Sequence, residues 1–237
     1  MNGLRASLAE VEKLAERLER GPRPACEIAI CPPATLLHAM GAIARSGGIE
    51  LGGQDCSPEA SGAFTGDISA QMLADAGANY VIVGHSERRA GHGETDDLVR
   101  RKAVAAIAAG LTPIVCVGET RAEREAGAAE TTAMRQLAGS VPDPAAGAPV
   151  VVAYEPVWAI GTGLTPTDDD IVRMHKVLRD QLVVRFGEAG GSIRLLYGGS
   201  VKPSNAAGIL ALPEVNGALV GGASLLADDF AAIIWAA

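Results

Sequence analysis

The segment Val81-Ile-Val-Gly-His-Ser-Glu-Arg-Arg89 decides the fold. Its first part belongs to an apolar run, Tyr80–Gly84, that shows no alternation of polar and apolar residues. Such a run is typical of a parallel strand that is buried on both faces. A histidine, His85, follows the run directly. Because active sites of parallel barrels lie at the carboxyl ends of their strands, His85 is a candidate functional residue.

The same order of short apolar strand, loop and amphipathic helix recurs on both sides of this segment. The predicted strands are Glu27–Ile30, Ile49–Gly53, Tyr80–Gly84, Thr112–Val117, Val150–Tyr154, Arg194–Tyr197 and Gly217–Val220. The helices predicted after them are Thr35–Ser46, Ser69–Ala76, Thr95–Ala109, Ala122–Leu137, Asp168–Phe186, Ser204–Leu210 and Asp228–Trp235. A further helix opens the chain, with Leu4, Leu8, Val11, Leu14 and Leu18 on one face.

The pattern therefore predicts seven parallel strands and eight helices in an α/β domain. The chain has 237 residues, close to the roughly 250 of a (β/α)8 barrel. An open, doubly wound sheet is the alternative architecture. Since no Pro-rich or Gly-rich linker divides the chain, residues 1–237 are predicted to form one domain. Thr35 and Thr167 are expected to cap helices.

Composition narrows the function classes. Hydrophobic residues make up 48% of the chain and aromatic residues 3%, so the core must be aliphatic, as in barrel interiors. The net charge of −8 argues against broad binding of nucleic acid or of an anionic membrane.

The four cysteines, Cys26, Cys31, Cys56 and Cys116, form no C-x-x-C pair. We expect free thiols and no metal site. The sequence has no apolar run of the ~18 residues that a membrane span needs, and its first ten residues do not resemble a signal peptide. These features predict a cytoplasmic protein.

Three further motifs follow predicted strands. Ala153-Tyr-Glu-Pro-Val-Trp-Ala-Ile-Gly-Thr-Gly163 places Glu155 directly after one strand, where we find no comparable second carboxylate at another strand end. Tyr197-Gly-Gly-Ser-Val201 and Leu219-Val-Gly-Gly-Ala-Ser224 place small residues after two others. The four motifs should converge on one rim. Gly161-Thr-Gly163 is not a dinucleotide motif, because the third glycine is missing and Pro166 follows.

Together these segments closely resemble the triosephosphate isomerase family, and the resemblance covers essentially the whole chain. It includes Gln54-Asp-Cys-Ser-Pro-Glu-Ala-Ser-Gly-Ala-Phe-Thr-Gly-Asp67, which is similar to the family's dimer loop. The resemblance implies a TIM barrel and interconversion of dihydroxyacetone phosphate and glyceraldehyde 3-phosphate through an enediolate, a step of glycolysis and gluconeogenesis. It implies no cofactor, a small phosphorylated triose as substrate, and a homodimer in which Thr65 contacts the partner.

The resemblance also assigns roles to residues. Glu155 would be the base and His85 the electrophile, as in the family. Glu87 would lie beneath the histidine. Pro156–Pro166 would be a lid. The predicted phosphate-binding residues are Gly161, Ser200, Gly221 and Gly222.

One feature departs from the family pattern, in which the first strand ends in Asn-x-Lys before Met-Asn-Gly. Here the sequence begins at Met1-Asn-Gly3. We therefore expect a barrel that lacks its first strand and its catalytic lysine, with severely impaired activity. A catalytically dead phosphate-binding or structural barrel is the alternative. Another phosphosugar enzyme, such as an epimerase, would need metal ligands or an aspartate pair at the strand ends, and we find neither.

Overall fold

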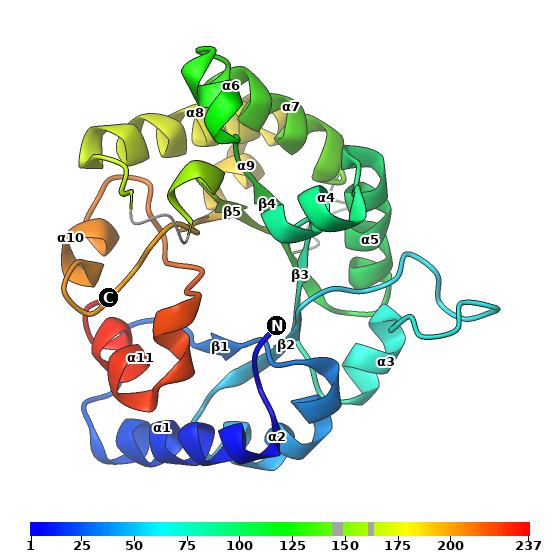
Figure 1. Cartoon of the computed structure of the whole chain (residues 1–237), viewed down its shortest axis with the longest axis vertical. Coiled ribbons are helices and arrows are strands. Elements are labelled where there is room, and N and C mark those ends of the chain that lie inside the picture. Colours follow the sequence, from blue (N-terminus) through cyan, green and yellow to red (C-terminus); the bar gives the residue numbers. More distant parts are fainter. Residues whose placement is uncertain (144–148, 161–163) are drawn as a thin grey trace.

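The computed structural model describes residues 1–143, 149–160 and 164–237. A ring of helices surrounds a curled parallel sheet (Figure 1). Among the described residues, no helix is both long and apolar enough to span a membrane.

The sheet has six strands, and each hydrogen-bonds to the next one in the chain, in parallel. The strands are β1 (Ala29–Ile30), β2 (Glu50–Gly53), β3 (Tyr80–Val83), β4 (Thr112–Val117), β5 (Val151–Tyr154) and β6 (Arg194–Tyr197). An open doubly wound sheet reverses its strand order at a switch point. The unbroken order β1 to β6 therefore confirms the barrel and rejects the alternative.

The seventh predicted strand, Gly217–Val220, is only partly formed. It joins β6 through a single parallel bridge between Tyr197 and Ala218. Two backbone bonds support the bridge: Tyr197 N donates to Gly217 O at 3.0 Å, and Leu219 N donates to Tyr197 O at 2.9 Å. The parallel arrangement was thus predicted correctly, but this segment lies beside the sheet with few ladder bonds.

The helices cover the outside of the sheet and match the prediction closely in position. They are α1 (Leu8–Arg20), α2 (Ala34–Ser46), α3 (Ala70–Asp75), α4 (Ser86–His92), α5 (Asp96–Ala108), α6 (Arg121–Glu125), α7 (Ala129–Ser140), α8 (Asp168–Phe186), α9 (Glu188–Ser192), α10 (Ala206–Leu210) and α11 (Ala227–Ile234). Short 3-10 helices span Arg5–Ser7, Val157–Ala159 and Gly222–Leu225.

The predicted total of eight helices is too low for the described residues. The predicted helix Ala122–Leu137 is divided into α6 and α7 at Gly127, which has a φ of +71°. The short helices α4 and α9 were missed because five to seven residues are too few to show a helical period.

Helix caps were predicted with mixed success. Thr167 does cap α8: its side chain accepts from Asp170 N at 3.2 Å, and the Asp170 carboxylate accepts from Thr167 N at 3.1 Å. This reciprocal pair is a capping box. Thr35 was predicted wrongly, because α2 begins one residue earlier, at Ala34, with Pro33 in the cap position.

The core has two layers, separated by the sheet. Along β3, Val81 and Val83 belong to the apolar cluster between sheet and helices. Their neighbours Tyr80 and Ile82 belong to a second cluster inside the barrel, which also contains Cys116. This alternation is what a pleated strand produces. The interior is therefore filled with side chains, as the aliphatic composition predicted.

The opening helix was predicted correctly except at its start. Val11, Leu14 and Leu18 are buried on one face of α1. Leu4 was assigned to the same face, but it precedes the helix and is 78% exposed.

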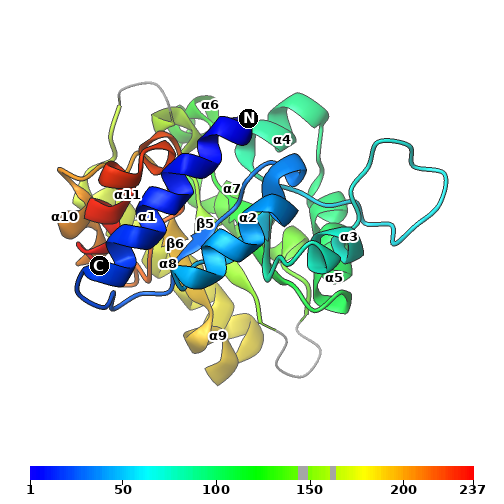
Figure 2. The same cartoon turned by 90° about the horizontal axis from the view of Figure 1, so that it is seen from below.

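The loop between β2 and α3 extends away from the barrel (Figures 1 and 2). Its two ends are tied together, since Ser57 N donates to Ile68 O at 2.7 Å and the Ser57 hydroxyl donates to Asp67 at 3.2 Å. Phe64, Ile68 and Met72 are apolar and exposed on the loop and on α3.

At the amino-terminal end of the strands, three side chains form a clasp across the barrel. Arg194, the first residue of β6, binds the Glu27 carboxylate at 2.6 Å and the Tyr80 hydroxyl at 3.2 Å. The Tyr80 hydroxyl also donates to Glu27. Glu27 lies two residues before β1, so the clasp connects the two ends of the six-stranded sheet.

Buried His175 predicts a pH-dependent stability. Its ring is 0% exposed and Nδ1 lies 3.0 Å from Glu214 O, whereas Nε2 has no hydrogen-bond partner among the residues that the structure describes. Burial lowers the pKa of His175. The unfolded chain therefore takes up a proton first as the pH falls below about 6.5, and the folded state loses stability by at most about 1.4 kcal/mol per pH unit.

We expect His175→Asn, whose amide can still donate to Glu214 O, to flatten the free energy of unfolding between pH 7.5 and 5.5. Urea titrations at each pH would measure this, with exposed His38→Asn as the control. If the free energy of unfolding changes with pH equally in the wild type and in His175→Asn, buried His175 is not the cause of the pH dependence.

Candidate active site

Glu155 directly follows β5, where a backbone hydrogen bond holds it and two neighbouring glycines leave it space. Its N–H donates to Val117 O at 2.8 Å, and its side chain is 2% exposed. A Cβ atom at Gly118 would lie 1.7 Å from the Glu155 carbonyl oxygen, and one at Gly198 would lie 2.9 Å from its Cγ. Both glycines are therefore needed to admit the glutamate.

His85 occupies the cap position of α4, directly after β3. Its Nδ1 accepts a hydrogen bond from Glu87 N at 3.3 Å, and its Nε2 lies 2.8 Å from Glu155 Oε1. When Nδ1 of a neutral imidazole accepts a hydrogen bond, the proton of the ring lies on Nε2. The geometry is that of a neutral imidazole that donates to the carboxylate, and the two residues predicted to be catalytic are in direct contact.

Ser86 also binds Glu155 and was not predicted from the sequence. Its backbone N–H donates to Oε2 at 2.9 Å, and its hydroxyl lies 3.5 Å from Oε1. Ser86 is the first residue of α4, where backbone N–H groups have no partner within the helix. A predicted helix start after His85 would have been the signal.

Charges in the site shift the pKa values of neighbouring groups. Burial lowers the pKa of His85, but the hydrogen bond and the charge of Glu155 outweigh it, so the pKa lies above its ordinary value. Burial, and then the charge of Glu155, raise the pKa of the Cys116 thiol well above its usual range. Burial raises the pKa of Cys31 to about 12. Both thiols inside the barrel are therefore protonated at neutral pH.

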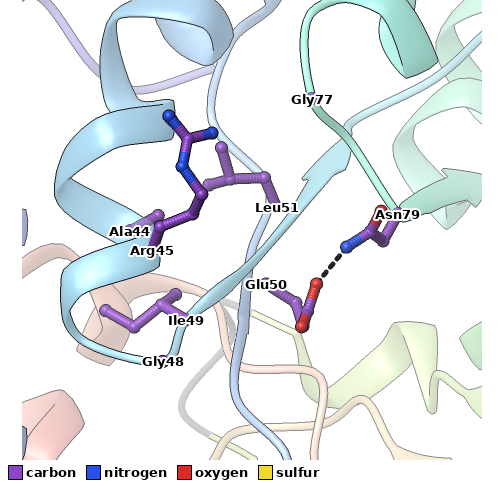
Figure 3. Close-up of a pocket in the computed structure, with 9 residues that line it drawn as sticks. Ala44, Arg45, Gly48, Ile49, Glu50, Leu51, Gly77 and Asn79 are labelled. Atoms are coloured by element: carbon purple, nitrogen blue, oxygen red, sulfur yellow. Dashed lines mark hydrogen bonds between the residues drawn. The ribbon is translucent and has the colours of Figure 1, made fainter.

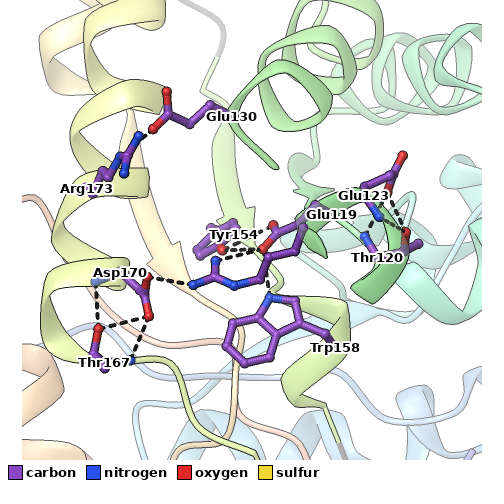
Figure 4. Close-up of polar contacts among 10 residues, drawn as sticks. Glu119, Thr120, Glu123, Glu130, Tyr154, Trp158, Thr167, Asp170 and Arg173 are labelled. Atoms are coloured by element: carbon purple, nitrogen blue, oxygen red, sulfur yellow. Dashed lines mark hydrogen bonds and ion pairs between the residues drawn. The ribbon is translucent and has the colours of Figure 1, made fainter. Parts of the chain in front are cut away.

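A second carboxylate, Glu119, follows β4, contrary to the prediction that no comparable strand end carries one. It is fully buried, and Trp158 Nε1 donates to it at 2.7 Å and the Tyr154 hydroxyl at 3.2 Å (Figure 4). The Arg124 guanidinium lies 4.4 Å from the centre of the Trp158 ring and binds Asp170 at 2.6 Å.

Tyr154 and Trp158 flank Glu155 in the chain, so Glu119 fixes the segment that carries Glu155. With its oxygens used in this way, Glu119 is a structural anchor and leaves Glu155 as the carboxylate next to His85.

The remaining predicted residues lie in different surroundings. Ser200, whose carbonyl accepts from Asn205 at 3.1 Å, follows β6. Gly221 and Gly222 are exposed at the start of a 3-10 helix, and a Cβ atom on either would meet no neighbour. Since Gly221 lies three residues beyond the bridge at Ala218, these residues share the rim of His85 and Glu155.

The exposed side chains of two other predicted residues lie apart from that group. Glu87 contributes its backbone N–H to His85, and its own side chain is exposed. Thr65 is exposed on the protruding loop. Gly161 and part of the predicted lid lie outside the described residues. The binding and dimer roles of all these residues stay predictions.

Two pockets lie away from the His85–Glu155 pair. One, of about 370 Å³, is lined by residues that include Arg45, Glu50 and Asn79 (Figure 3). It lies at the amino-terminal ends of β2 and β3, opposite to the rim. The other, of about 460 Å³, lies between the protruding loop and the charged residues Arg88, Glu94 and Lys102.

The contact between His85 and Glu155 predicts how the histidine titrates. Glu155→Gln removes the charge that stabilises the imidazolium, while burial remains. The pKa of His85 should therefore fall below its ordinary value of about 6.5. NMR titration of the imidazole resonances would measure this. Glu87→Gln removes a weaker charge effect and should lower the pKa less. A larger shift in Glu87→Gln than in Glu155→Gln would contradict this account.

Comparison with known proteins identifies the family. The family model described as triosephosphate isomerase matches residues 1–237. A triosephosphate isomerase of Afipia carboxidovorans is 62% identical over 98% of this chain and 92% of its own length. One of Rhodopseudomonas palustris is 60% identical over 98% of this chain and 92% of its own.

A solved structure agrees with these relatives. The crystal structure of triosephosphate isomerase from Bartonella henselae superposes with a TM-score of 0.91 at 46% identity, over 100% of this chain and 94% of the other. With a buried glutamate and a histidine in contact on the rim of a parallel barrel, and with these relatives, the chain belongs to the triosephosphate isomerase family.

Proposed function

We propose that this chain interconverts dihydroxyacetone phosphate and glyceraldehyde 3-phosphate through an enediolate. The observation that supports this best is the 2.8 Å contact between His85 Nε2 and the Glu155 carboxylate, two groups on the ends of different strands. Isomerisation of a hydroxyketone needs a base beside a carbon and a hydrogen-bond donor beside an oxygen, and these two side chains supply them.

In the proposed reaction, the Glu155 carboxylate removes a proton from the carbon next to the carbonyl group. The electrons of that C–H bond form the carbon–carbon double bond of the enediolate, and the carbonyl oxygen takes the negative charge. The hydroxyl proton on the reacting carbon then moves to the charged oxygen, so the negative charge passes to the oxygen of the reacting carbon. As this oxygen forms the aldehyde C=O, the electrons of the carbon–carbon double bond take a proton from the same carboxyl group onto the neighbouring carbon, so no co-reactant is consumed. His85 Nε2–H donates to the oxygen where charge develops, which is often the largest contribution to catalysis.

Without substrate, the Glu155 carboxylate and the His85 imidazole are already in contact. Ser86 and His85 hold the carboxylate in place, at 2.9 Å from Ser86 N and 2.8 Å from His85 Nε2. When substrate oxygens take over the histidine bond, the base is left with fewer donors and becomes more basic. Ser200, Gly221 and Gly222 would bind the phosphate from the same rim, because glycine allows backbone N–H groups to approach an anion closely.

Deuterium exchange into dihydroxyacetone phosphate tests the role of Glu155. We expect Glu155→Gln to abolish exchange at the reacting carbon, because the amide cannot accept the proton. Glu16→Gln, on the exposed surface of α1, is the matched control and should exchange like the wild type. Exchange in Glu155→Gln at the wild-type rate would exclude the proposed base.

The expectation of impaired turnover stays a prediction, as does the alternative of a phosphate-binding barrel without activity. The predicted impairment concerns a lysine charge near the substrate. Removing one group that stabilises charge in the transition state commonly lowers the rate on the order of 10² to 10³-fold. A coupled assay with dihydroxyacetone phosphate distinguishes these outcomes. Turnover as fast as that of an active triosephosphate isomerase assayed beside it would refute the impairment, and absence of turnover with retained phosphate binding would support the alternative.

A homodimer is the proposed assembly, with Thr65 on the protruding loop in contact with the partner. The exposed apolar residues Phe64, Ile68 and Met72 support this, since adjoining exposed apolar residues mark interaction sites. Location in the cytosol is retained as a proposal from the sequence alone.

Sedimentation at tens of micromolar tests the dimer. We expect a dimer for the wild type and a shift toward monomer for Phe64→Ser, which removes the apolar contact. Val184→Ser, at an 80% exposed residue on α8, should leave the assembly unchanged. A monomeric wild type would exclude the proposal.

A further inference from the structure

Arg89 makes four hydrogen bonds with one guanidinium group. Its Nε donates to Gly84 O at 2.9 Å, and one terminal nitrogen donates to Cys116 O at 3.0 Å and to Ser140 Oγ at 2.9 Å. The other terminal nitrogen donates to Asp96 at 2.7 Å. The side chain is 15% exposed, so most of this charge is removed from water and is satisfied by fixed partners.

The two carbonyl groups that Arg89 binds belong to neighbouring strand ends. Gly84 is the residue between β3 and His85, and it has a φ of +67°, a conformation that other residues rarely adopt. Cys116 is the penultimate residue of β4, and its side chain lies inside the barrel. One guanidinium therefore connects the turn that aims His85 to the strand between His85 and Glu155.

Both connections lead to the catalytic contact. The carbonyl of Gly84 belongs to the peptide that carries His85 N, so its position sets the direction in which the imidazole leaves the backbone. The Cys116 thiol is close enough to Glu155 for the carboxylate to raise its pKa, and Val117, the next residue, accepts the Glu155 N–H at 2.8 Å.

We propose that Arg89 is a positioning residue for the isomerase reaction, which holds His85 and Glu155 at their working distance through the Gly84 and Cys116 carbonyls. This rests on the proposed function for its kinetic consequence only. Arg89 reaches neither catalytic side chain itself, and it acts on the backbone beneath them.

Only arginine has the donors that this position uses. The guanidinium presents five N–H groups in a planar fork, whereas lysine offers a point charge. Asp96 holds the fork in place, and it is itself bound by Arg135 at 2.7 Å and by Ser140 at 3.2 Å. Arg135 is 59% exposed, so it provides a matched control that breaks the same carboxylate's contacts without touching the strand ends.

The test compares Arg89→Ala, Arg89→Lys and Arg135→Ala in two measurements. The first is kcat and KM for dihydroxyacetone phosphate. We expect Arg89→Ala to lower kcat by about 10²-fold with KM little changed, as for small displacements of catalytic groups, and Arg135→Ala to stay within about twofold. Millimolar guanidinium chloride, but not sodium chloride, should partly restore Arg89→Ala, and Arg89→Lys should not recover activity.

The second measurement is the NMR titration of His85, which needs no turnover. We expect the pKa of His85 in Arg89→Ala to move down toward that of Glu155→Gln, because the carboxylate is no longer held against the imidazole. If Arg89→Ala does not fold, Arg89→Lys provides the same comparison. A wild-type His85 titration in a folded Arg89 variant would overturn the inference. If the wild type does not exchange deuterium into dihydroxyacetone phosphate, the proposed function is refuted. The titration of His85 would still test whether Arg89 positions the histidine against Glu155.

Discussion

The contact between the His85 imidazole and the Glu155 carboxylate is the constraint on which the rest of the site depends. A carboxylate that is 2% exposed is costly unless several donors satisfy it. Here the donors come from His85 Nε2 and from the backbone of Ser86. All belong to the segment after β3, while the carboxylate belongs to the segment after β5. The contact exists only if three adjacent strands end at nearly the same level.

Parallel pairing provides that level. Val83, the last residue of β3, pairs with Val115 of β4, and Val117, the last residue of β4, pairs with Tyr154, the last residue of β5. In this register, β3 ends two residues before β4, and β4 and β5 end together. His85 follows β3 within two residues, and Glu155 follows β5 directly. Gly118 and Gly198 then leave the space that the Glu155 backbone and side chain occupy. Strand register and these two glycines therefore determine where Glu155 lies relative to His85.

Much of this could be predicted from the sequence. Unbroken apolar runs such as Thr112–Val117 gave correct strand limits, and His85 and Glu155 were found because each follows such a run. Other features depend on contacts between distant segments. Glu119 and Glu155 both come within two residues of a strand end, so the local sequence does not show that Glu119 binds Trp158 while Glu155 lies beside His85. Arg88 and Arg89 are adjacent arginines, and the sequence does not show which of them reaches the strand ends. The strand Gly217–Val220 failed to form a full ladder because its pairing depends on neighbours and not on its own apolar pattern.

The clasp of Glu27, Tyr80 and Arg194 has a mechanical consequence. Within the described residues, β1 pairs only with β2, so the two ends of the curled sheet are not joined by a ladder. The clasp joins them through side chains at the amino-terminal end. It links residues that lie 167 positions apart in the sequence, so the first and last strands of the sheet cannot separate at this end unless the Arg194–Glu27 ion pair breaks.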